Sequence, residues 1–227
     1  YAAWPLWAAR GPAEVSKFVL RLVPALAGLL ALLAALLSRR VLGSAAALLC
    51  GLLLAVAPDQ TFYSRMFIHE VLLAASGLGL LLAVAGLVLN RDIRSARLVP
   101  VLAVLALSAK ETAAFLLLAV GLAAGATLLL ERRAETLNYL NDAAPIERSV
   151  LKGLVQGSLI GLVIWAALFS SLGANPRGLL DFFAAFIFWG NTAGADHVKS
   201  VWYFLGLLQR LDWPLWLLAL PAALAGL

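Results

Sequence analysis

The sequence contains one cysteine, two histidines and one methionine among 227 residues, and only 13% of the residues are charged. A single cysteine, Cys50, cannot build a disulfide framework within the chain. The two histidines lie far apart in the sequence, so no zinc-ligand spacing is present. The sequence also lacks a phosphate-binding glycine loop and a dinucleotide-binding glycine pattern, and it therefore gives no support for nucleotide-driven chemistry.

Apolar residues make up 63% of the sequence, and the mean hydropathy is +0.97. Soluble domains contain about 45–50% apolar and about 25% charged residues. This excess of apolar side chains excludes a soluble globule and a disordered chain, and it predicts an integral membrane protein. The net charge of +5 does not indicate a nucleic-acid partner, because the basic residues are scattered between apolar runs, as they are at membrane flanks.

Apolar runs recur along the whole sequence. A helix of about 20 apolar residues crosses a bilayer core, and lipid-exposed backbone must satisfy its own hydrogen bonds. The sequence therefore predicts an all-α polytopic membrane bundle of about seven spans, with 1–227 as one transmembrane domain. Because the last run is still apolar at its end, we expect a longer protein. The predicted spans are Phe18–Leu37, Val41–Ala57, Val71–Leu89, Leu98–Ala109, Thr112–Leu130, Leu154–Leu172 and a seventh beginning near Trp213.

Short arginine clusters occur in alternate connections between these runs. Basic residues concentrate in cytoplasmic loops, so the sequence predicts that these connections are cytoplasmic. The remaining connections, including the long segment 174–212, are then non-cytoplasmic. The clusters are Arg39-Arg40, Arg91 with Arg94 and Arg97, and Arg132-Arg133.

The fourth predicted span, Leu98–Ala109, is short, because its 12 residues rise only about 18 Å. The following pair, Lys110 and Glu111, is therefore expected in a polar recess on the non-cytoplasmic side, because ionisable groups at that depth need partners or water. Lys110 could hold a phosphate there. The alternative is an ion pair, either mutual or between helices, without chemistry.

A second ionisable cluster opens the third span. If the segment is helical, Arg65 and His69 pair at i,i+4 and Glu70 lies beside them. Glu70 could simply complement a helix N-terminus. The functional interpretation is a site for an anionic head group, with Arg65 on phosphate and Glu70 as base or metal ligand.

The outer segment 174–212 is the least lipid-like part of the sequence. Residues 177–189 are expected to form an amphipathic helix in the membrane interface. A polar loop follows, and its His197 and Lys199, with Trp202 beyond them, could reach over the recess. A plain solvated loop explains the same composition equally well.

Four short motifs occur in order: F-Y-S-R-M-F-I-H-E, S-A-K-E-T-A-A-F, F-S-S-L-G-A-N-P-R-G-L-L-D and H-V-K-S-V-W-Y-F-L-G-L-L. Together they resemble the GT-C superfamily of polyprenyl-phosphate-sugar-dependent glycosyltransferases. The similarity is to the flippase activity-associated branch, which is similar to dolichyl-phosphate-mannose–protein mannosyltransferases.

The resemblance implies a prokaryotic plasma-membrane enzyme that acts at the non-cytoplasmic face on a polyprenyl-phosphate lipid. It implies that Arg65 and Glu70 line the cavity and that Lys110 approaches the lipid phosphate. His197, Lys199 and Trp202 would lie in the loop that caps the cavity. The catalytic aspartate of such enzymes usually lies in the first outer loop, and no matching residue precedes Phe18.

Three functions from different classes follow from the sequence. The first is inverting sugar transfer, in which Glu70 assists an upstream aspartate; Mg²⁺ or Mn²⁺ would suit carboxylate and phosphate oxygens. The second is a non-catalytic GT-C-like subunit that packs against other membrane subunits through small-residue stretches such as 77–79 and 121–125. The third is a lipid-carrier transporter, which the lack of a visible inverted repeat disfavours.

Overall fold

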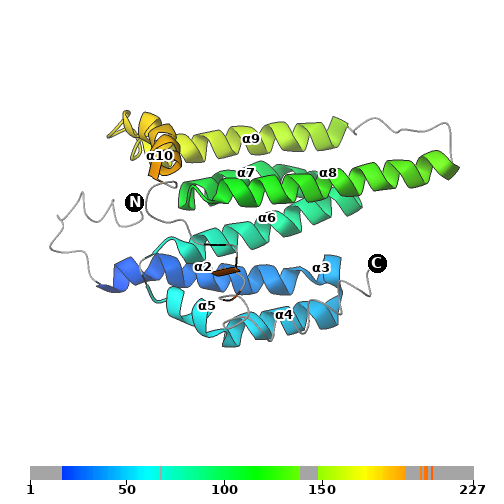
Figure 1. Ribbon diagram of the computed structural model, residues 1–227, viewed down its shortest axis with the longest axis horizontal. Helices are drawn as coiled ribbons and strands as arrows, with labels where there is room; N and C mark the ends of the chain where they lie inside the picture. The colour runs from blue at the N-terminus through cyan, green and yellow to red at the C-terminus, as the bar shows by residue number, and fades with distance from the viewer. Residues whose placement is uncertain are drawn as a thin grey trace. The chain divides into compact units, whose positions relative to one another are not determined.

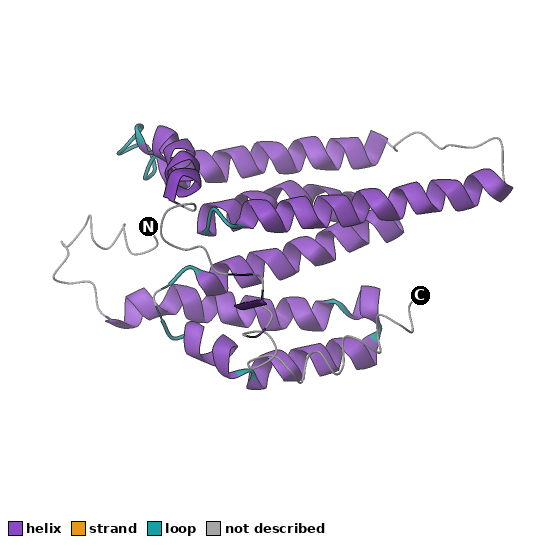
Figure 2. Cartoon of the chain, viewed as in Figure 1, coloured by secondary structure: helices purple, strands orange, loops and turns teal. Residues whose placement is uncertain are grey.

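A computed structural model describes residues 17–66, 68–138 and 148–192, together with positions 200, 202, 203 and 206. Throughout this part of the chain the secondary structure is helical, with connecting loops and no strand (Figure 2). The predicted all-α fold class is therefore confirmed. The chain divides into two compact units, Tyr1–Phe182 and Phe183–Leu227. The first unit holds the helical bundle, and the second contains the end of the last described helix.

The described residues form a succession of helices (Figure 1). Their bounds are α2 Lys17–Leu37, α3 Arg39–Leu42, α4 Ser44–Val56, α5 Pro58–Tyr63, α6 Glu70–Asn90, α7 Ile93–Ala109, α8 Ala113–Asn138, α9 Arg148–Phe169 and α10 Gly178–Thr192.

Four of the described helices, α2, α6, α8 and α9, are long and apolar enough to cross a membrane. They match the first, third, fifth and sixth predicted spans. Their outward faces expose large apolar side chains, such as Leu29, Leu122 and Val163, which suit contact with lipid. The seventh predicted span lies outside the described residues.

The second predicted span is divided into α3 and α4. Gly43 lies between them with φ 82°, a left-handed conformation that glycine adopts without strain. The 13 residues of α4 extend only about 20 Å, which is shorter than a hydrocarbon core of about 30 Å.

The fourth predicted span begins earlier than the sequence indicated. Helix α7 starts at Ile93 rather than Leu98 and has 17 residues, so it extends about 26 Å. The reason is Asp92, whose carboxylate accepts hydrogen bonds from the backbone N–H groups of Arg94 and Ser95 at 3.2 and 3.1 Å. The predicted start of this span at Leu98, and the length of about 18 Å that followed from it, are therefore wrong.

Within the first unit, α6 packs against α2, α7 and α8, and α7 packs against α6 and α9. Glycine permits several of these close approaches. A Cβ atom on Gly77 would lie 2.9 Å from Leu116 of α8, and one on Gly86 would lie 2.5 Å from the hydroxyl of Ser95 on α7. Gly77 thus packs within the chain, whereas a Cβ atom added to Gly121 or Gly125 of α8 would have no described atom within 4 Å.

Helix α9 approaches α7 through three glycines at four-residue spacing, Gly153, Gly157 and Gly161, all of them buried. Added Cβ atoms there would meet the backbone oxygens of Ile93, Arg97 and Pro100, in that order. Residue numbers rise in the same direction along both helices at these contacts, so α7 and α9 run parallel. We call this line of contact the seam. This seam was not predicted from the sequence, although its small-residue spacing was readable.

Candidate functional site

Glu70 is the first residue of α6, and its position follows from where the preceding chain stops being helical. Helix α5 ends at Tyr63, and residues 64–66 form turns before the chain reaches His69, the residue before α6. The side chain of His69 does not cap the helix. A carboxylate in the first turn is favoured by the helix dipole, so Glu70 has a local reason to be there.

Lys110 is the residue at which α7 ends. Its backbone is extended, and its N–H group donates to the carbonyl of Ala106 at 3.1 Å. A short turn then leads into α8, where the N–H group of Ala113 donates to the carbonyl of Lys110 at 3.0 Å. Because α6 and α7 are antiparallel, the end of α7 lies beside the beginning of α6.

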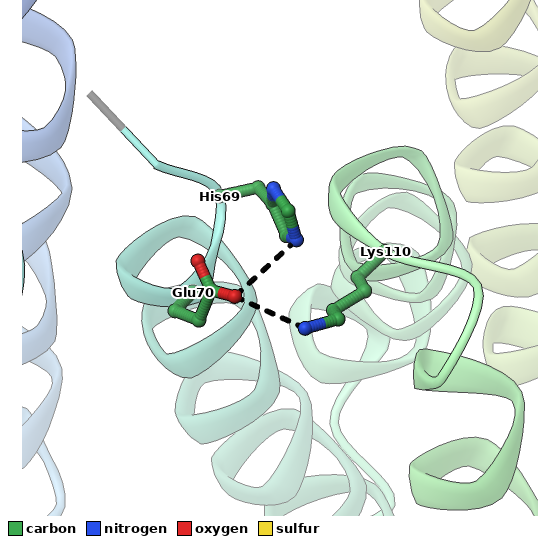
Figure 3. A network of polar contacts seen from close by, with 3 residues as sticks. All are labelled: His69, Glu70 and Lys110. Atoms are coloured by element: carbon green, nitrogen blue, oxygen red, sulfur yellow. Dashed lines mark hydrogen bonds and ion pairs between the residues drawn. The ribbon is translucent and has the colours of Figure 1, made fainter. Parts of the chain in front are cut away.

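The ammonium group of Lys110 donates to Oε1 of Glu70 at 3.0 Å, across 40 positions of sequence (Figure 3). Nε2 of His69 lies 3.4 Å from the same oxygen. The side chains of Lys110 and Glu70 are 32% and 38% exposed, so water screens the pair only in part. Two helix junctions therefore supply one partly buried ionic cluster. The ion pair between helices is the alternative without chemistry that the sequence left open for Lys110.

The second carboxylate oxygen of Glu70, Oε2, is buried and has no hydrogen-bond partner among the described residues. Ser108, in the last turn of α7, has a buried hydroxyl in the same condition. A buried polar atom normally finds a protein or water partner. Glu70 can therefore accept a further hydrogen bond, and the hydroxyl of Ser108 can separately donate or accept one.

Arg65 does not join this ionic pair in the described part of the chain. It is exposed in the turn after α5, and no described carboxylate lies within 4.0 Å of its guanidinium group. The helical i,i+4 pairing with His69 does not form, because α6 begins only at Glu70. Glu111 is partly buried, but Lys110 pairs with Glu70 instead of with its neighbour.

The outer segment enters the described structure only in part. Helix α10, Gly178–Thr192, agrees with the predicted helix at 177–189. His197 and Lys199 lie outside the described residues. Trp202 belongs to the second compact unit and is 79% exposed.

Among the described residues there is no group of three His, Cys, Asp or Glu side chains that could hold a metal ion. Glu70 alone would need further ligands to hold a divalent ion.

Two residues of structural interest, Ser108 and Asp92, were not predicted from the sequence. A serine one turn before the end of an apolar run, and an aspartate directly before a helix, were the available signals.

No protein-family model, curated protein or solved structure matches the chain.

Proposed function

We propose that the chain is a membrane glycosyltransferase of the GT-C kind, which moves a sugar from a polyprenyl-phosphate donor to an acceptor at the non-cytoplasmic face. The observation that carries this proposal is the pairing of Lys110 with Glu70 at 3.0 Å. It brings a cation suited to phosphate and a carboxylate suited to accepting a proton to one end of the apolar helices.

The proposed reaction is a single inverting displacement. The acceptor hydroxyl oxygen forms a bond to the anomeric carbon of the sugar, and the bond from that carbon to the phosphate oxygen breaks. The hydroxyl proton passes to a carboxylate, for which Glu70 is the described candidate. Lys110 stabilises the negative charge that develops on the departing lipid phosphate.

This reaction requires an exchange of ionic partners. In the described structure Lys110 and Glu70 neutralise one another. A donor phosphate that binds Lys110 would take over the ammonium group and leave Glu70 available to the acceptor hydroxyl. Partial exclusion of water would strengthen both interactions.

We also propose the membrane arrangement that this function needs. The chain would form one transmembrane domain of about seven spans in a prokaryotic plasma membrane, with 174–212 at the outer face. The exposed basic residues Arg39, Arg94 and Lys152 lie at helix ends opposite to Glu70 and Lys110, which supports a cytoplasmic location for them.

The test is transfer by the full-length gene product in proteoliposomes, with labelled polyprenyl-phosphate sugars as donors. We expect Glu70→Gln and Lys110→Ala each to reduce the rate at least about tenfold, since a hydrogen bond to a charged group contributes about 1.5–3 kcal/mol. Asp59→Asn and Arg21→Gln remove exposed charges from α5 and α2 and serve as matched controls. Wild-type rates in both site variants would exclude the proposed roles.

The second candidate is a non-catalytic subunit of a larger membrane complex. The observation in its favour is that Glu70 and Lys110 already satisfy one another's charge and tie α6 to α7. A structural bridge of this kind needs no substrate. Copurification with other membrane subunits, together with a failure to transfer sugar from any polyprenyl phosphate, would favour this candidate.

A further inference from the structure

The parallel pairing of α7 and α9 brings their N-terminal turns side by side at the end of the bundle opposite to Glu70. Nη2 of Arg97 donates a hydrogen bond to Oε1 of Gln156 at 2.8 Å. This bond spans the seam between the two helices and shows which edge of the seam the two side chains occupy.

Helix periodicity places three further cations along the same edge. Arg94 precedes Arg97 by three residues on α7, while Lys152 and Arg148 precede Gln156 by four and eight residues on α9. Residues three or four apart are neighbours on one helix face, so Arg148 lies beside Lys152 and Lys152 lies beside Gln156. All four basic side chains are exposed. We call Arg94, Arg97, Arg148 and Lys152 the basic edge.

The basic edge places positive charges where they destabilise the two helices. The N-terminal end of a helix carries partial positive charge, and cations are unfavourable there. Neither α7 nor α9 has an acidic residue in its first turn. Asp92, the residue before α7, accepts hydrogen bonds from the N–H groups of Arg94 and Ser95 and from the hydroxyl of Ser95, and its charge also attracts Arg94. No described carboxylate lies within 4.0 Å of the four cations.

We propose that the basic edge binds the phosphate of an anionic phospholipid head group in the leaflet at this end of the bundle. This surface is independent of the proposed sugar transfer. An external anion would offset the clustered side-chain charge and the dipole of α9, which has no acidic residue in its first turn. A lipid fits better than a soluble anion, because α9 is long and apolar enough to cross a membrane and α7 packs along it, so the basic edge lies where such a helix meets the head groups.

The test is thermal unfolding of the purified full-length protein in neutral detergent, with short-chain phosphatidylglycerol, short-chain phosphatidylcholine or inorganic phosphate added. A ligand that binds only the folded state raises the unfolding temperature, and at a given ligand concentration the rise is larger for a tighter ligand. We expect phosphatidylglycerol to stabilise the wild type more than the other two additives. The double variant Arg94→Gln/Lys152→Gln, which keeps the bond between Arg97 and Gln156, should bind phosphatidylglycerol at least about tenfold more weakly.

The control is Arg21→Gln/Arg177→Gln, which removes the same charge from exposed positions at the opposite end and should respond like the wild type. An unchanged response in Arg94→Gln/Lys152→Gln would overturn the proposal. So would an equal response to phosphatidylcholine, or a response to inorganic phosphate as large as that to phosphatidylglycerol. Unfolding temperatures without additive show that each variant is folded.

Discussion

Gly157 of α9 lies directly against the backbone carbonyl of Arg97 on α7, where any Cβ atom would collide with the carbonyl oxygen. The atoms of Arg97 at this contact belong to the backbone, so rotation of a side chain could not remove the collision. Gly153 makes a similar contact with Ile93, whose carbonyl oxygen would lie 2.7 Å from an added Cβ atom. The seam therefore fixes the distance between α7 and α9, and with it the position of the basic edge.

The first prediction concerns this seam. Gly157→Ala should reduce the free energy of unfolding by about 1–3 kcal/mol, because the two helices must separate to admit the methyl group. Gly121→Ala on α8 is the matched control, since a Cβ atom there meets no described atom within 4 Å. The control should be neutral or more stable by about 0.5–1 kcal/mol. Equal effects of the two substitutions, measured by thermal unfolding in micelles, would contradict the packing described.

The second prediction separates a structural bridge from a functional site. Lys110→Ala should lower stability by about 1 kcal/mol, as expected for a partly screened ion pair. The exchanged variant Glu70→Lys/Lys110→Glu restores an ion pair with reversed direction, and its unfolding temperature should recover toward that of the wild type.

Sugar transfer should not recover in the exchanged variant, because the cation and the carboxylate then face the wrong groups of donor and acceptor. If transfer recovered together with stability, the pair would act only as a bridge. Measuring both properties on the same preparations keeps the two outcomes distinguishable.

The third prediction concerns the acid dependence of the α7 N-terminus. The hydrogen bond from the N–H group of Arg94, together with those from Ser95, lowers the pKa of Asp92 below its usual value of 3.8. A group with a lowered folded-state pKa stabilises the protein above its unfolded pKa, and this contribution is lost as the pH falls through the folded-state pKa. The stability difference between wild type and Asp92→Asn should therefore be largest above about pH 5 and shrink below about pH 4.

A related substitution tests the cap itself. Asp92→Ala removes the acceptor of two backbone N–H groups, so it should cost about 0.5–2 kcal/mol at neutral pH. Hydrogen exchange of the Arg94 and Ser95 amides should accelerate in this variant. If those amides remain as protected as in the wild type, the carboxylate is not their partner.

The fourth prediction concerns the buried hydroxyl of Ser108. Ser108→Ala should leave the unfolding temperature nearly unchanged, because the hydroxyl has no described protein partner to lose. If the hydroxyl instead serves the proposed substrate, the same variant should raise the KM for the polyprenyl-phosphate donor. A large loss of stability without substrate would show that the hydroxyl already has a structural partner.

The sequence by itself determined the helical class and most of the helix positions. Leucine- and alanine-rich runs of about 20 residues can satisfy their backbone only as helices in lipid, whatever their neighbours are. It also singled out Glu70 and Lys110, because charged residues at the ends of apolar runs are conspicuous. Capping by Asp92 was readable in principle, yet the apolar pattern alone placed the start of α7 too late.

Only the tertiary structure decided which charges meet. Lys110 could have paired with Glu111, its neighbour in the sequence, and Glu70 could have paired with Arg65, which precedes it by five positions. The sequence could not rank these pairings. The antiparallel contact of α6 with α7 made the choice, since it brings the start of one helix beside the end of the other. Likewise, the arginines of α7 and the basic residues of α9 are more than 50 positions apart in the sequence. They form one basic edge because three glycines let α9 lie parallel to α7 and directly on its backbone.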